Sequence, residues 1–257
     1  MPEHSSPDVV TEAVGRHVAR IVFDRRAAAN ALLPETAVAI EQALRALQAD
    51  PDVRVVQLRG AGGRVFCGGF DLSGVTTGVR DVELQSLLTA LRTSPVPTVA
   101  VLDGHAVGAG LDLAASCDLR IARTGSRIGL PATRIGVAYH PVGLRRMVQM
   151  VPALRRVLLT GEVVPIESVA GFADGIATPE ELDALVDETC RAIVAGAPTS
   201  VTYMAAMIRP TDVLDVDTAI AWRDHILDGP DPAESAAARA AGRDPQYAAR
   251  RPWKAPA

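Results

Sequence analysis

The chain has 257 residues, of which 48% are hydrophobic, and it carries a formal net charge of −4 with a pI near 5.7. This length and composition suffice for one sizeable core with a small appendage and leave no room for a second full domain. The acidic balance provides no basic surface for nucleic acid, and no apolar run approaches the roughly 20 residues of a membrane span.

The first half of the chain alternates predicted strands and helices. Residues 1–15 are expected to form a flexible tail, because they include a proline- and serine-rich start. The elements that the periodicity predicts next are a strand at Val18–Phe23, a helix at Pro34–Ala49, a strand at Val53–Leu58, a helix at Val82–Arg92 and a strand at Thr98–Leu102. Such alternation favours an α/β fold.

Helical patterns dominate from Pro179 onward, without a convincing strand. They cover Glu180–Ala195, Val201–Ile208, Val213–Leu227 and Ala233–Ala241. We therefore expect residues 16–195 to form the core and residues 196–257 to form a helical C-terminal region.

Two turns built from small residues each follow a predicted strand. One carries FCGGFDL at residues 66–72, and the other begins DGHAVGAGLDLAASCDLRIA at residues 103–122 and opens a helix. The first N–H groups of a helix lack internal partners and carry partial positive charge, and glycine and alanine allow a ligand to come close. The two turns together predict a pair of converging N–H donors, which is an oxyanion hole.

These two motifs resemble those of the crotonase (enoyl-CoA hydratase/isomerase) superfamily. The resemblance continues, in the same order, through RRAAANAL at residues 25–32, SRIGLPA at 126–132 and LLTGE at 158–162. It implies a β-β-α superhelix with a helical C-terminal appendage that packs a homotrimer or a dimer of trimers. It also implies an acyl-CoA or a carrier-bound pantetheine thioester as substrate, with no cofactor beyond the CoA moiety.

The resemblance assigns roles to four residues. The backbone N–H groups of Gly68 and Ala109 would hold the thioester oxygen, and Asp112 would transfer protons where the family commonly carries glutamate. The second glutamate of hydratases is replaced by Ala132, which favours double-bond isomerisation with one shuttling base over ordinary hydration. His140 is a candidate to fill that gap. A hydratase or lyase with an altered second residue is the next hypothesis. Decarboxylation, thioester hydrolysis, a helix-dipole role for Asp112 and a structural role for His140 remain open.

The resemblance also places the CoA moiety against two segments. The expected contacts are Arg25, Ala27 and Ala29 in the first segment and Gly68, Phe70, Asp71 and Leu72 in the second. The arginine pairs at Arg145–Arg146 and Arg155–Arg156 are further candidates to meet phosphates of a small ligand.

Two further expectations follow. The three scattered cysteines have no metal-like spacing and suit free thiols in a reducing, cytoplasmic setting. Because Ala132 removes one carboxylate, a catalytically silent acyl-CoA-binding or partner protein of the same fold is the alternative to an enzyme.

Overall fold

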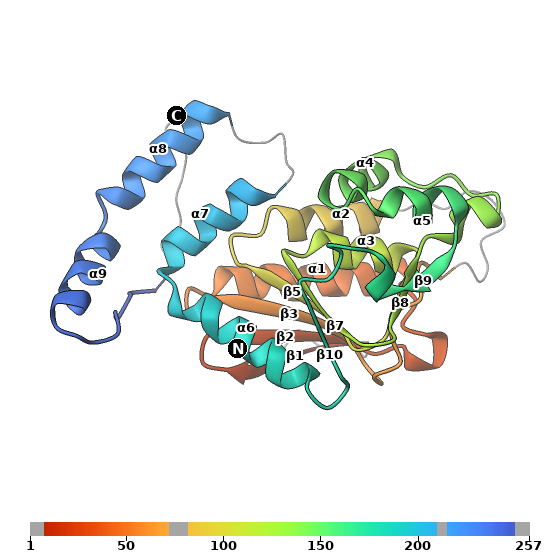
Figure 1. Ribbon diagram of the computed structural model, residues 1–257, viewed down its shortest axis with the longest axis horizontal. Coiled ribbons are helices and arrows are strands. Elements are labelled where there is room, and N and C mark those ends of the chain that lie inside the picture. The colour runs from red at the N-terminus through yellow and green to blue at the C-terminus, as the bar shows by residue number, and fades with distance from the viewer. Residues whose placement is uncertain (1–7, 72–81, 210–214, 250–257) are drawn as a thin grey trace.

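The computed structural model describes residues 8–71, 82–209 and 215–249. Its larger sheet has six strands in the order β1-β2-β3-β5-β7-β10 (Figure 1). These strands are β1 (Val9–Gly15), β2 (Val18–Phe23), β3 (Val55–Gly60), β5 (Thr98–Leu102), β7 (Leu119–Arg123) and β10 (Gly175–Ala177). The β1–β2 pair is antiparallel, and every other neighbouring pair in this sheet is parallel.

The smaller sheet has four strands in the order β4-β6-β8-β9. They are β4 (Val65–Cys67), β6 (His105–Val107), β8 (Arg127–Gly129) and β9 (Val163–Pro165). The chain passes from β3 to β4, from β5 to β6 and from β7 to β8, so each unit gives one strand to each sheet before a helical segment follows. This repeated β-β-α order confirms the predicted superhelix.

The described residues include nine α-helices. They are α1 (Pro34–Ala49), α2 (Val82–Arg92), α3 (Ala109–Ser116), α4 (Pro141–Met150), α5 (Leu154–Thr160), α6 (Leu182–Ala195), α7 (Pro198–Ile208), α8 (Val216–Leu227) and α9 (Pro230–Ala240). Side chains alternate across β5: Ala100 and Leu102 face the core shared with α1 to α3, whereas Val99 and Val101 face α6. The six-stranded sheet is therefore covered on both faces (Figure 1).

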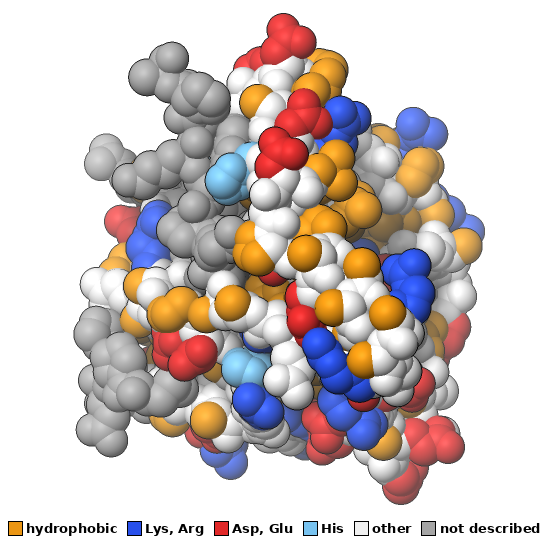
Figure 2. Space-filling model, turned by 90° about the vertical axis from the view of Figure 1, so that its left-hand side faces the viewer, with side chains coloured by type: hydrophobic (Ala, Val, Ile, Leu, Met, Phe, Trp, Pro, Cys, Tyr) orange, Lys and Arg blue, Asp and Glu red, His pale blue; other side chains and the backbone are white. Residues whose placement is uncertain are grey.

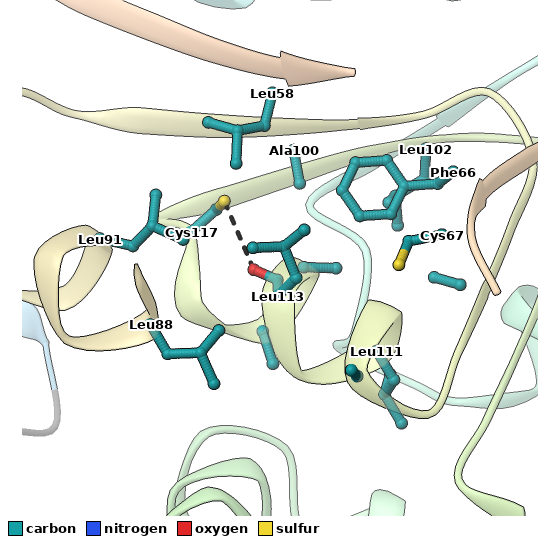
Figure 3. Close-up of a cluster of buried hydrophobic side chains, with 14 of the residues drawn as sticks. Leu58, Phe66, Cys67, Leu88, Leu91, Ala100, Leu102, Leu111, Leu113 and Cys117 are labelled. Atoms are coloured by element: carbon teal, nitrogen blue, oxygen red, sulfur yellow. Dashed lines mark hydrogen bonds between the residues drawn. The ribbon is translucent and has the colours of Figure 1, made fainter. Parts of the chain in front are cut away.

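Helix α3 is buried along its whole length, which is the feature that fixes the site. Leu113 lies among side chains from β3, β5 and α2, and Cys117 Sγ donates to the carbonyl of Leu113 at 3.6 Å (Figure 3). A helix that is apolar on every side is held by packing all round. Its first turn, which carries Ala109 and Asp112, is therefore held rigidly.

The expected flexible tail over residues 1–15 is wrong for its second part, and residues 1–7 lie outside the described residues. Residues 9–15 form β1, which pairs with β2 from Val9 opposite Phe23 to Gly15 opposite Val18. The turn between the strands contains His17 at φ +67°. A short β-branched segment was sufficient to form an edge strand because β2 provides a partner directly after the turn.

The C-terminal helices match their predicted ranges within a few residues, apart from residues 210–214, which lie outside the described part. Helix α6 ends at Ala195 and α7 begins at Pro198, and α7 to α9 project from the main body (Figure 1). Figure 2, which faces these helices, shows hydrophobic side chains gathered on their surface. The exposed large ones on α7 and α8 are Met204, Ile208, Val216, Ile220 and Leu227.

Candidate active site

The two small-residue turns meet at a cavity of about 440 Å³. The lining includes Phe70 from the first turn and Ala109 from the second. It also includes three residues of interest for catalysis, which are Ala132, Tyr139 and His140. Most of the other lining residues are apolar or glycine. Within the described residues, Tyr139 and His140 supply the only titratable side chains of the lining.

Two backbone amides of the first turn donate to carbonyls of the segment at residues 25–32. The amide of Gly68 donates to the carbonyl of Ala29 at 2.9 Å, and the amide of Asp71 donates to the carbonyl of Leu32 at 2.8 Å. The amide of Phe70 has no acceptor among the described residues. The expected donor Gly68 is therefore already engaged, and Phe70 carries the available N–H of this turn.

The second turn begins α3. Gly108 precedes the helix at φ +59°, and its amide donates to the carbonyl of Gly129 at 2.8 Å. The amide of Ala109 lies in the first turn of α3, where N–H groups lack partners within the helix, and in the described residues it has no other acceptor. The Ala109 amide is therefore available to a ligand, and its role as an oxyanion donor stays a prediction.

The two turns are in van der Waals contact with each other. A Cβ atom built on Gly69, at φ +119°, would lie 3.2 Å from the carbonyl oxygen of Val107 and 3.7 Å from the nitrogen of Ala109. A Cβ atom on Gly110 would lie only 2.2 Å from the carbonyl oxygen of Cys67. Glycine is required at both positions for this close approach.

Asp112 is fully buried and is not part of the cavity lining. Its Oδ2 accepts a hydrogen bond from the Tyr139 hydroxyl at 3.0 Å, and its Oδ1 forms an ion pair with Arg146 of α4. Burial lowers the pKa of Arg146, and the Arg92 guanidinium lowers it further, whereas the carboxylate in contact with it favours the charged form. Protonation of Asp112 would leave Arg146 buried without its counter-charge.

His140 lies directly before α4 and lines the cavity. Its Nδ1 is buried and has no hydrogen-bond partner in the described part of the chain. Ala132 lies on the 3₁₀ helix Pro131–Arg134 and contributes a methyl group to the lining. No carboxylate side chain of the described residues lines this cavity.

The segment expected to bind CoA is braced against the first turn. The Arg25 guanidinium donates to the carbonyl of Ala31 and, at 3.1 Å, to Oδ2 of Asp71, while the buried Asn30 amide donates to the carbonyls of Ala61 and Val65. Ala27 and Ala29 are exposed on this segment. Leu72 lies outside the described residues.

Sequence reasoning missed Arg146 as a partner of Asp112. The sequence indicated Arg146 only as a candidate contact for a phosphate group of a small ligand. On the amphipathic helix α4, the Arg146 side chain faces the protein interior, whereas its neighbour Arg145 is exposed. The helical periodicity was therefore the signal that could have identified Arg146 as a buried residue.

The described residues contain neither a metal-binding cluster nor a membrane-spanning helix. No group of three or more His, Cys, Asp or Glu side chains in ranges 8–71, 82–209 and 215–249 is arranged to hold a metal ion. In the same ranges no helix has the length and apolar character required to cross a bilayer.

Comparison with known proteins gives a consistent result. The family model described as enoyl-CoA hydratase/isomerase matches residues 14–230. The (E)-benzylidenesuccinyl-CoA hydratase of Thauera aromatica is 32% identical over 213 residues, which cover 77% of this chain and 82% of that protein. The short-chain-enoyl-CoA hydratase of Clostridium acetobutylicum is 28% identical over 228 residues, covering 84% and 86%.

Solved structures agree with these sequence relatives. The crystal structure of an enoyl-CoA hydratase/carnithine racemase from Magnetospirillum magneticum superposes with a TM-score of 0.86 at 27% identity, covering 95% of this chain and 96% of that one. The matched fold, the two abutting turns and the family model lead to one conclusion: this chain is a member of the enoyl-CoA hydratase/isomerase family.

Proposed function

We propose that the protein is an enzyme that acts on an acyl-CoA, or on a carrier-bound pantetheine thioester, through an enolate. The amides of Phe70 and Ala109 hold the thioester oxygen. The observation that carries the proposal is that both residues line one cavity and that neither amide has an acceptor among the described residues. In comparable sites one such donor contributes roughly 2.7–4 kcal/mol to the transition state.

Migration of a double bond is the reaction proposed for this site. His140 takes a proton from C2 of a 3-enoyl thioester, the two amides stabilise the dienolate, and His140 returns the proton to C4 to give the 2-enoyl product. One base suffices for this sequence, which suits a lining that has alanine at position 132 and no described carboxylate.

Asp112 then has a different role from the expected proton transfer. It holds the hydroxyl of Tyr139 at 3.0 Å, and it is itself held by Arg146. Because Tyr139 lines the cavity and Asp112 does not, Tyr139 contacts the acyl group and Asp112 is a positioning residue.

Exchange of substrate hydrogen with solvent tests the enolate directly. Wild-type protein is incubated in D₂O with a panel of saturated, 2-enoyl and 3-enoyl-CoA thioesters, and deuterium at C2 and C4 is followed by mass spectrometry and NMR. His140→Gln is expected to slow exchange by about 10²–10⁴-fold, while Arg145→Gln, a change on the exposed side of α4, leaves it unchanged. Absence of exchange with every thioester would overturn the proposal.

A catalytically silent acyl-CoA-binding protein is the second candidate. It is favoured by the same lining without a described carboxylate and by the burial of Asp112 against Arg146. Saturable binding of CoA esters by wild-type protein, together with no exchange and no turnover, would select this candidate over the enzyme.

A further inference from the structure

A second cavity, of about 360 Å³, lies on the other side of the Asp112–Arg146 pair. It forms where the end of α2, the end of α3, α4 and the end of α7 meet, and none of its lining residues lines the first cavity. Its volume is in the range of small-molecule sites.

Two of the guanidinium groups that line this second cavity have N–H donors without an acceptor among the described residues. The Arg146 side chain is only 4% exposed, and its Nε and Nη1 have no hydrogen-bond acceptor in the described residues. Arg92, at the end of α2, donates from Nη2 to the Thr89 hydroxyl at 3.0 Å, but its Nη1 is buried without an acceptor in the same residues. A buried donor left without a partner costs about 1–3 kcal/mol.

The charge around the cavity is not balanced. Four arginines line it, and Arg120 pairs with Asp174 at 2.8 Å while Arg209 pairs with Asp118 at 2.6 Å. Arg146 shares its charge with Asp112, but Arg92 has no ion pair among the described residues. One positive charge is therefore left over, next to a second guanidinium.

We propose that this cavity is a binding site for a small molecule that carries an oxyanion, either a carboxylate or a phosphate group, held between Arg92 and Arg146. A water molecule would satisfy the free donors, but it would leave the positive charge of Arg92 without a counter-charge among the described residues. An oxyanion supplies both, and guanidinium donors match the geometry of carboxylate and phosphate oxygens. Met150 and Ile208 offer apolar contact for the remainder of the ligand.

The site connects to the first cavity through a single side chain. Arg146 has Nη2 on Asp112, and its Nε and Nη1 remain for the anion. An anion bound there would therefore contact the same guanidinium group that pairs with Asp112, and Asp112 in turn accepts the hydrogen bond from Tyr139. The inference itself depends on the arginines alone and not on the reaction proposed above.

Isothermal titration calorimetry tests the site with inorganic phosphate, acetate and succinate as probes, at ionic strength held constant with chloride. Wild-type protein is expected to bind at least one probe saturably. Arg92→Gln is expected to bind that probe at least tenfold more weakly. Arg92→Lys keeps the positive charge but loses the planar set of guanidinium N–H donors, so it is expected to bind with intermediate affinity. Arg145→Gln is the matched control, because it removes an exposed arginine from the same helix, and its binding should equal that of wild type.

The pattern of probes identifies the ligand group: phosphate binding without succinate or acetate binding assigns a phosphate, and the reverse assigns a carboxylate. Added CoA should not displace the probe, since the two cavities share no residue. Circular dichroism verifies that the Arg92 variants are folded. No saturable binding of any probe, equal binding by folded Arg92→Gln, or displacement by CoA would overturn the inference.

Discussion

Asp112→Asn is expected to destabilise the protein strongly, because it removes the counter-charge of a buried guanidinium. Arg146 is 4% exposed and Asp112 is fully buried, so the remaining charge cannot reach water without rearrangement. Breaking a buried pair in this way costs about 3–5 kcal/mol. At roughly 2–4 °C per kcal/mol for a chain of this size class, the melting temperature should fall by about 6–20 °C.

Thermal unfolding followed by circular dichroism measures this shift, and two variants make it interpretable. Asp224→Asn breaks the exposed Arg223–Asp224 pair on α8 and should change stability by less than about 0.5 kcal/mol. Replacing both partners, as in Asp112→Leu with Arg146→Met, should recover much of the loss, because no unpaired charge remains. A melting temperature of Asp112→Asn within about 2 °C of wild type, as small a shift as that of the control variant, would show that the pair does not stabilise the fold. Such a result would favour a direct catalytic role for Asp112.

Three further results are expected. Gly110→Ala should cost about 1–3 kcal/mol in urea unfolding and should slow α-proton exchange, because its Cβ would lie 2.2 Å from the carbonyl of Cys67 and must push the two turns apart; unchanged values would refute the close contact. Burial raises the pKa of the Cys67 and Cys117 thiols to about 12, so a thiol reagent at pH 8 should label them only after unfolding, and rapid labelling of native protein would contradict this. The exposed Met204 and Ile208 on α7 favour burial against another copy, so light scattering should give a trimer or a dimer of trimers, and a monomer at micromolar concentration would exclude the proposed assembly.

The elements with a clear period were predictable from the sequence. The helix at Pro34–Ala49 and the strands at Val18–Phe23 and Thr98–Leu102 have the predicted limits. The helix repeats its apolar residues at helical spacing, and each strand is a short, mostly apolar run. The strands of the smaller sheet were not predicted as such, since each spans only three residues. Such short strands carry no measurable period, and their partners lie far away in the chain.

The site was predictable in outline but not in its contacts. The two turns could be found because their small residues follow strands, and Ala109 followed from its place at the start of a helix. Which amide of the first turn remains available depends on the carbonyls of Ala29 and Leu32, which come from a different segment. The partner of Asp112 is likewise 34 positions away, and no local pattern joins the two.

The brace between the segment at residues 25–32 and the first turn has a consequence for redesign. Gly68 is bonded to Ala29 and Asp71 to Arg25, and Phe70 lies between Gly68 and Asp71. Substitutions in residues 25–32 that are meant to accept a thioester of a different carrier group would therefore also displace the Phe70 amide. Preference for the carrier group and activation of the thioester carbonyl are therefore structurally linked in this chain. Variants that improve either property need to be screened for both.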